Sequence, residues 1–362
     1  MHSQTFLGED QVEALAHGCA ILSGGGGGET ALAQAMTLVA VREAGPVELL
    51  DLDRLADDAV ILPLALIGAP TVLSERIFAG SEAARIRADV EDALGAPVAA
   101  VMTAQIGGGS GVCGLMWAAR LGLPLVDADG VGAAATDIFM TTMHLHGLPS
   151  SPLVLADPLG SLVRISATDN VRLARLAKGV AATLGGACVG GMYPMRAAVA
   201  RQATVRRSVS HALALGAALG ANAEDPVGAL LSACDGRLLL RGRIVEVERR
   251  SRVGATHAAL VIAGLADDED RLMRLELQNE VLIAQVDGEL VASAPDVISV
   301  LETASGHGIS RESIRRGQRV SVVALPCDPV WRTPQGLALR GPGAFGYDLP
   351  YQPVEARAVA DA

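Results

Sequence analysis

Short apolar runs alternate with longer amphipathic segments over the first 150 residues of the chain. Apolar runs at residues 17–22, 60–66, 98–103 and 123–130 predict buried strands. Apolar positions that recur every three or four residues predict helices at 29–42, 81–94, 112–121 and 133–146. Alternating strands and helices predict a layered α/β domain with a mixed or parallel sheet and Gly-rich loops. Ligand sites in such domains lie beyond the carboxyl ends of the strands.

The pattern changes near residue 235, after a predicted helix at 205–219. Val245 and Val247 alternate with glutamates, and an Asp287-Gly288 turn separates two strand-like runs. We therefore expect a second, β-rich domain. The predicted organisation is an α/β domain over 1–166, a helical and Gly-rich connecting segment over 167–234, the β-rich domain over 235–355 and a tail over 356–362.

Two glycine loops interrupt the first half. The first contains five consecutive glycines, Gly24 to Gly28, and the second contains Gly107, Gly108 and Gly109. The first loop is not a P-loop, because Glu29 and Thr30 follow it and the only lysine of the chain is Lys178. The third glycine of the dinucleotide fingerprint is also missing. We predict that the main chain here closely approaches a neutral or cationic group.

Composition excludes several classes of function. The chain has 40 acidic and 29 basic residues and 2% aromatic residues, which argues against nucleic-acid binding. Its start lacks the pattern of a secretory signal, so we expect a cytoplasmic protein. Residues 93–119 are uncharged, but six glycines interrupt them, so we expect no membrane span. The five cysteines are scattered, which predicts neither disulfides nor structural zinc.

Asp127 and Asp129 are the first candidates for chemistry, because they follow an apolar strand and precede Gly130. Residues two apart on a strand point to the same side, about 6.5 Å from each other, and a buried like charge would raise one pKa. Either aspartate could instead bind loop N–H groups or cap a helix. Cys113, at a predicted helix start, is a possible nucleophile, although apolar neighbours favour a buried thiol.

Other polar residues have weaker patterns. Thr141 and Thr142 could offer hydroxyl groups to a ligand, whereas His144 and His146 are two apart on a predicted helix and do not form a metal site. Gln278, Asn279 and Glu280 interrupt an apolar stretch, which predicts a ligand face, a domain-interface network or an exposed edge strand.

Ten segments together resemble one known family. They are GCAILSGGGGGET, APTVLSE, QIGGGSG, LPLVDADGVG, TTMHLHG, GRIVEVERR, LQNEVLIA, APDVISVLE, GQRVSVVALP and GPGAFGYDLPYQPV. In this order they look like the S-methyl thiohydantoin desulfurase family. The resemblance implies hydrolysis of a five-membered hydantoin-like ring, in which water replaces the S-methyl group and methanethiol leaves. No cofactor and no metal are implied.

The resemblance also implies roles for the residues above. Asp127 or Asp129 would activate water, and Gly25, Gly26, Gly27 and Gly28 or Gly107, Gly108 and Gly109 would bind the ring carbonyl, with Glu29, Thr141 and Thr142 nearby. The chain departs from the family pattern at Ala133, where arginine is usual, and at Gln105, where glutamate is usual.

Three readings of function follow. The first is a hydrolase of small cyclic amides, imides or S-alkyl thiohydantoins, as a possible homo-oligomer. The second is a non-catalytic partner of a hydantoinase- or oxoprolinase-type enzyme, and the third is a metal-dependent amidohydrolase.

Overall fold

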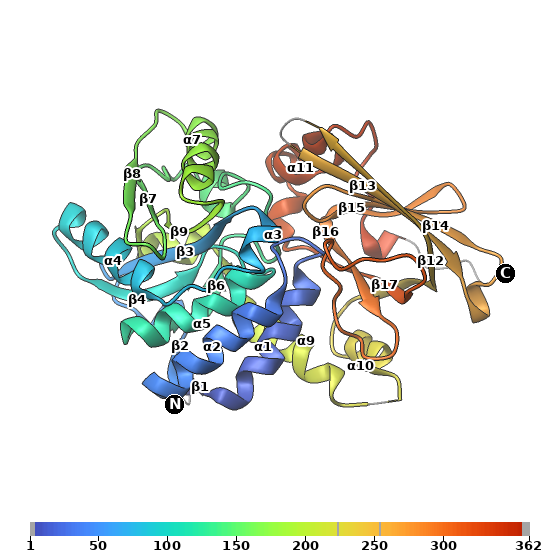
Figure 1. Ribbon diagram of the computed structural model, residues 1–362, viewed down its shortest axis with the longest axis horizontal. Coiled ribbons are helices and arrows are strands. Elements are labelled where there is room, and N and C mark those ends of the chain that lie inside the picture. The colour runs from blue at the N-terminus through green and yellow to red at the C-terminus, as the bar shows by residue number, and fades with distance from the viewer. Residues whose placement is uncertain (1–3, 223, 253–254, 357–362) are drawn as a thin grey trace.

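The computed structural model describes residues 4–222, 224–252 and 255–356 and contains two domains that lie side by side (Figure 1). The first is built on a nine-stranded mixed sheet and the second on a closed six-stranded barrel. The fold class predicted from the sequence is therefore confirmed. Residues 357–362, which make up nearly all of the predicted tail, lie outside the described residues.

The sheet of the first domain has a parallel centre and antiparallel flanks. Its spatial order is β1 (Thr5–Leu7), β2 (Val47–Leu50), β5 (Leu125–Val126), β4 (Val98–Thr103), β3 (Val60–Gly68), β9 (Ala187–Gly191), β7 (Leu153–Ala156) and β8 (Leu162–Ile165), with β10 (Met195–Arg196) beside β3. Strands β2, β5, β4 and β3 are parallel, and β1, β9, β7 and β8 are antiparallel to their neighbours. A small ribbon joins β6 (Ala128–Asp129) to β11 (Val205–Arg206).

Helices cover both faces of the sheet. One layer contains α1 (Glu9–Leu22), α2 (Thr30–Ala44), α4 (Ser81–Leu94), α5 (Gly109–Leu121) and α9 (Ser208–Leu219), and the other contains α7 (Asn170–Thr183) and α8 (Ala197–Ala203). The period of two along β3 produces this division: Leu62 and Leu64 pack in the first core, and Ile61 packs in the second. Short helices are α3 (Pro70–Leu73), α6 (Thr142–Leu145), α10 (Pro226–Ser232) and α11 (Pro334–Arg340).

The barrel consists of antiparallel neighbours in chain order. Its strands are β12 (Arg237–Arg252), β13 (Ala255–Gly264), β14 (Leu272–Leu277), β15 (Val281–Val286), β16 (Glu289–Glu302) and β17 (Arg319–Leu325), and β17 pairs with β12 to close it. Side chains such as Leu240, Leu275 and Val322 fill the interior. The predicted Asp287-Gly288 turn joins β15 to β16, as expected.

Residues 17–22 form the end of α1 and not a strand. The reason is a close helix–helix contact with α9: a Cβ atom at Gly18 would lie 1.8 Å from the carbonyl oxygen of Ala212, and one at Gly216 would lie 1.8 Å from that of Ala14. This part of the helix is buried by neighbours on several sides, so its sequence is an apolar run like that of a buried strand. The five-glycine loop therefore joins two helices.

Two other predictions differ from the structure. Residues 133–146 are helical only in α6, because the main chain of residues 133–135 bonds to side chains and loops from elsewhere in the fold. The segment 167–234 supplies β9 to the sheet, α7 to one face and α9 to the other, so it is an integral part of the sheet domain.

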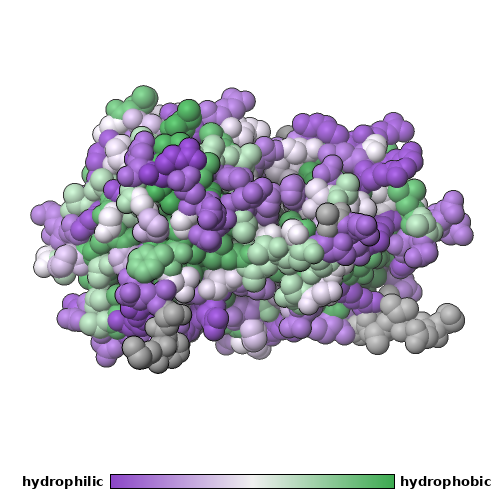
Figure 2. Space-filling view, turned by 90° about the horizontal axis from the view of Figure 1, so that it is seen from below, coloured by the Kyte–Doolittle hydropathy of each residue, from purple (hydrophilic) through white to green (hydrophobic). Residues whose placement is uncertain are grey.

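No helix within the described residues is long and apolar enough to cross a bilayer. The uncharged stretch 93–119 instead forms β4, the second glycine loop and most of α5. In the face seen in Figure 2, apolar residues occupy a band along the middle and polar residues border it. Such exposure is ordinary for a chain with 50% hydrophobic residues.

Candidate active site

The two glycine loops pack directly against each other. Gly109 N–H donates to the carbonyl of Gly27 (3.1 Å), Gly108 N–H to that of Cys19 (2.8 Å), and Gly107 N–H to that of Ala133 (3.0 Å). The N–H groups of all three glycines of the second loop are therefore already paired within the protein. This corrects the expectation that Gly107, Gly108 and Gly109 bind a ring carbonyl.

The first loop also packs on the barrel. The carbonyl of Gly24 accepts from Val281 N–H (2.8 Å) and that of Gly25 from Arg311 N–H (3.0 Å). A Cβ atom at Gly26 would lie 2.8 Å from Nδ2 of Asn279. The close approach predicted for this loop is thus an approach to the protein's own main chain and to an uncharged amide.

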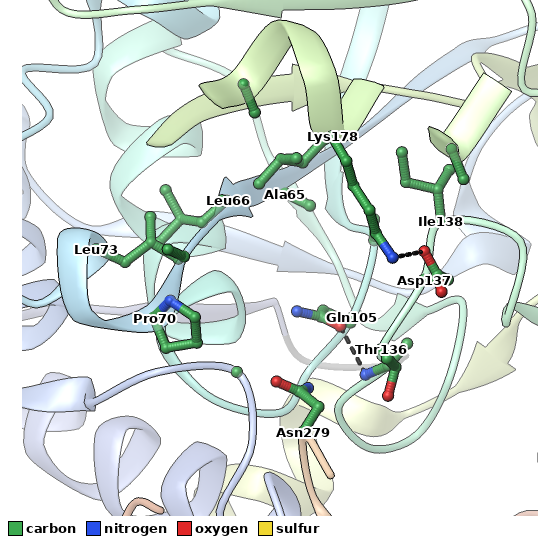
Figure 3. A pocket seen from close by; sticks show the side chains of 18 of the residues that line it. Ala65, Leu66, Pro70, Leu73, Gln105, Thr136, Asp137, Ile138, Lys178 and Asn279 are labelled. Atoms are coloured by element: carbon green, nitrogen blue, oxygen red, sulfur yellow. Dashed lines mark hydrogen bonds and ion pairs between the residues drawn. The ribbon is translucent and has the colours of Figure 1, made fainter. Parts of the chain in front are cut away.

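A cleft of about 370 Å³ opens beside these loops at the carboxyl end of β3 (Figure 3). Its apolar wall includes Leu66, Pro70, Leu73, Val131, Ile138 and Met192, and its polar residues are Gln105, Thr136, Asp137, Thr141, Lys178 and Asn279. Asn279 comes from the barrel, so both domains contribute to the cleft. Of the residues predicted for the site, Gly27 and Thr141 line it.

An ion pair lies in this cleft. Nζ of Lys178, on α7, is 2.5 Å from Oδ1 of Asp137, which follows the loop after β6. The carboxylate side chain is 16% exposed and the lysine side chain 58% exposed, so the lysine reaches over the opening to a nearly buried partner (Figure 3). The ammonium group and the carboxylate together offer a proton donor and a proton acceptor to a bound molecule.

The amide of Gln105 has a fixed orientation. Its Oε1 accepts from Ala135 N–H at 2.8 Å, and because a main-chain N–H only donates, the facing atom must be the oxygen. Nε2, which is 3.4 Å from Oγ of Ser110, is therefore the atom available as a donor in the cleft (Figure 3).

Asp127 and Asp129 bond to different segments of the chain, and neither lines the cleft. Asp127 accepts hydrogen bonds from the N–H (2.9 Å) and the hydroxyl (2.5 Å) of Ser210, in the first turn of α9. It therefore stabilises a helix start, which is the capping role that the sequence left open.

Asp129 is fully buried and accepts N–H donors from Ile106 (2.8 Å), Val131 (3.0 Å) and Gly132 (2.9 Å). Burial raises its pKa to about 7, although the same N–H groups act in the opposite direction. The carboxylate joins the loop before Gly107 to the loop after β6. Its contacts are with the main chain that shapes the cleft and not with the cleft itself.

The remaining candidates also have structural partners. Cys113 is buried, and burial raises the pKa of its thiol to about 12, which is opposite to what a nucleophile requires. Thr142 donates to the carbonyl of Ala203 (2.7 Å), so its hydroxyl proton is used. His144 bonds to Asn170 and His146 to the carbonyl of Thr142, and no cluster of metal-ligating side chains is found among the described residues.

Gly28 and Glu29 line a second groove, of about 680 Å³, between α2 and the barrel. The carboxylate of Glu29 accepts from the hydroxyls of Ser310 (3.1 Å) and Ser313. Both residues thus line a different space from the cleft that Gly27 lines. Gly25 and Gly26 line neither space.

Gln278, Asn279 and Glu280 form the turn between β14 and β15 and face the first domain. Glu280 is buried and accepts from Oγ1 of Thr136 at 3.0 Å. Of the interpretations left open by the sequence, an interface network describes this turn, and Asn279 adds a cleft contact to it. Sequence reasoning gave no role to Lys178, although its being the only lysine was visible.

Two family models together match nearly the whole chain. They are described as the S-Me-THD-like N-terminal domain, over residues 10–167, and the S-Me-THD-like C-terminal domain, over residues 168–354. An X-ray crystal structure of a protein from Chromobacterium violaceum is similar, with a TM-score of 0.80 and 24% identity over 97% of this chain and 100% of that chain. At this identity the likeness shows the fold. No curated protein matches the chain.

Proposed function

The chain belongs to the S-Me-THD-like family, and from that premise we propose that it hydrolyses a small five-membered ring of the S-methyl thiohydantoin type in the cleft between its domains. The cleft volume of about 370 Å³ suits a ring with a modest substituent. The apolar wall would hold the substituent and the S-methyl group, and the polar end would hold the ring edge.

Ring recognition follows from the fixed amide of Gln105. Nε2 would donate to the ring carbonyl, which is a role that the N–H groups of Gly107, Gly108 and Gly109 cannot take because they are already paired. The amide of Asn279, which comes from the barrel, can donate or accept. A neutral polar end of this kind suits an uncharged heterocycle better than a phosphate or a carboxylate.

The reaction uses Asp137 and Lys178 as a proton acceptor and a proton donor. Asp137 would take a proton from water as its oxygen bonds to the ring carbon that carries sulfur. The C=N electron pair of the ring would move onto the ring nitrogen in this addition, and its return would break the C–S bond so that the sulfur leaves as methanethiolate, which Lys178 would protonate. The proton on the added oxygen would then move to the ring nitrogen, which gives the hydantoin. Proton transfer from Asp137 to Lys178, which are 2.5 Å apart, restores both groups. The products are the hydantoin and methanethiol.

The observation that carries this proposal is that the only lysine of the chain forms an ion pair within a two-domain cleft. Lysine is rare enough here that its place is informative, since arginine supplies every other cationic side chain except the histidines. We infer that an ammonium group able to give up its proton is required at this position.

The test is methanethiol release from a 5-substituted S-methyl thiohydantoin, followed with a thiol reagent. Asp137→Asn and Lys178→Met are expected to lower kcat by about 100-fold or more, the range for loss of a general acid or base. Asp127→Asn is the matched control, because it removes a carboxylate from the same region outside the cleft. Full activity of both cleft variants would refute the assignment.

A binding function without turnover is the second candidate. It is favoured by one observation: the carboxylate proposed as the base is already held in an ion pair. A wild-type protein that binds the ring but releases no thiol would support this role, as a partner of a hydantoinase- or oxoprolinase-type enzyme.

A further inference from the structure

A buried polar cluster connects the barrel to the cleft wall. Glu280 lies in the β14–β15 turn, and its Oε2 is 3.0 Å from Oγ1 of Thr136. Arg340, on α11, is 3.9 Å from Oε1 of the same carboxylate and donates to the carbonyl of Ala134 at 2.7 Å. Glu280 and Arg340 are nearly fully buried, so their part of the cluster has a defined geometry.

The cluster determines whether the Thr136 hydroxyl donates or accepts a hydrogen bond in the cleft. A free threonine hydroxyl can donate or accept, but an ionised carboxylate can only accept. Burial raises the pKa of Glu280, and the guanidinium group of Arg340 acts in the opposite direction and favours the ionised form. In the ionised cluster the Thr136 hydroxyl donates its single proton to Oε2. Only the lone pairs of Oγ1 remain for a molecule in the cleft that Thr136 lines.

Thr136 and Gln105 then form a complementary pair. Ala135, the residue before Thr136, donates to Gln105, so the two polar side chains lie at the same end of the cleft (Figure 3). Thr136 offers an acceptor and Gln105 offers a donor. Neither role can be exchanged, because Thr136 donates its proton to Glu280 and the oxygen of Gln105 accepts from Ala135. The N–H and C=O groups of a ring amide present the opposite pattern side by side.

We propose that Glu280 is a specificity-determining positioning residue, which holds Thr136 as an acceptor so that the cleft selects rings with an unsubstituted N–H beside the carbonyl. This inference rests on the proposed function and deepens it. The ligand class is cyclic amides, imides and amidines with a free ring N–H. Rings alkylated at that nitrogen are excluded, because the methyl group would meet an acceptor that has lost its partner.

The experiment is calorimetric binding of a 5-substituted hydantoin and of its derivative methylated at the ring nitrogen between the two carbonyls. The wild-type protein is expected to bind the N–H ring at least about tenfold more tightly than the N-methyl ring, as for one hydrogen bond in a desolvated site. Thr136→Val and Glu280→Gln should bring this ratio close to one, since a glutamine NH₂ group can donate to Thr136. Thr136→Ser should keep the wild-type ratio, and so should Glu302→Gln, which changes an exposed barrel carboxylate.

The outcomes separate the two proposals. The role of Glu280 and Thr136 would be overturned if the wild-type protein bound the N–H ring and the N-methyl ring equally well, or if Thr136→Val kept the wild-type ratio of the two affinities. Ring binding itself would still support the proposed function in either case. If neither ring binds at millimolar concentration, both the proposed function and this inference are wrong. Should Glu280→Gln fail to fold, the comparison of Thr136→Val with Thr136→Ser still decides the question.

Discussion

Replacing Gly27 or Gly28 by alanine tests whether the five-glycine loop is built for contact with the second glycine loop. Both glycines have a positive φ, +69° and +78°, so an alanine at either is strained to a similar degree. They differ in their surroundings. A Cβ atom at Gly27 would lie 2.8 Å from the carbonyl oxygen of Gly107, whereas one at Gly28 would meet nothing within 4 Å.

The expected magnitudes follow from these contacts. A left-handed alanine costs about 1–2 kcal/mol, and the loss of glycine's freedom in the unfolded chain returns about 0.4–1 kcal/mol, so Gly28→Ala should destabilise by about 0–1.6 kcal/mol. Gly27→Ala must also displace the second loop and weaken the bond from Gly109 to Gly27. Overpacking costs about 1–3 kcal/mol and the bond about 1 kcal/mol, so we expect a difference of about 2–4 kcal/mol between the variants.

The assay is urea unfolding of both variants beside the wild-type protein, followed by far-UV circular dichroism. The slopes should agree, so that the shift in midpoint reports stability alone. Equal midpoints for Gly27→Ala and Gly28→Ala would refute the argument, because the shared backbone strain would then account for the whole effect and the loop contact for none.

Three further predictions concern residues outside the cleft. Asp127→Asn should lower the free energy of unfolding by about 1–2 kcal/mol, because the carboxylate accepts two bonds from Ser210, while ring binding by calorimetry stays at the wild-type level; lost binding in a folded variant would place Asp127 in the site. In the native protein, Cys113 should react with iodoacetamide at pH 8 much more slowly than in urea, because its thiol is buried. Peptide mass spectrometry measures both rates, and equal rates would contradict the burial. Burial and the stacked ring of His307 lower the pKa of His17, so below about pH 6.5 the unfolded chain takes up a proton that the folded protein does not. The contribution of His17 to stability should therefore fall as the pH falls from 7 to 5, and the buried carboxyl of Asp129 contributes in the opposite direction. The melting temperature of the wild-type protein relative to His17→Gln should decrease over this range, and a difference that does not change with pH would refute the role of His17.

The sequence predicted those elements whose local pattern and tertiary environment agree. The helix Ser81–Leu94 and the strand Val98–Thr103 have the predicted bounds, because an amphipathic helix and a buried parallel strand each keep their own periodicity in the fold. The prediction of a strand at the end of α1 was wrong, because a helix buried on several sides has the same apolar run as a buried strand. Only the contact of Gly18 with Ala212 distinguishes the two, and that contact is between distant segments.

The sequence predicted where the candidate site lies in the fold better than it predicted which residues line it. The carboxyl ends of the strands and the glycine loops were expected to border the site, and the cleft lies there, at the end of β3. Asp137 and Lys178 are 41 positions apart and meet only because α7 crosses the sheet, so no local spacing indicates the pair. The two aspartates after the apolar run looked catalytic because their contacts with Ser210 and Ile106 are equally non-local.

The central claim, that a small ring binds in the cleft beside Lys178, has a direct measurement because the chain contains a single lysine. Acetylation of the protein with a limiting amount of acetic anhydride, read by mass spectrometry, reports on that amine with the N-terminal amine as an internal reference. We predict that saturating S-methyl thiohydantoin slows acetylation of Lys178 several-fold and leaves the N-terminal amine unchanged. An equal rate at Lys178 with and without the ring, under conditions where calorimetry shows the ring bound, would place the ligand elsewhere and contradict the account.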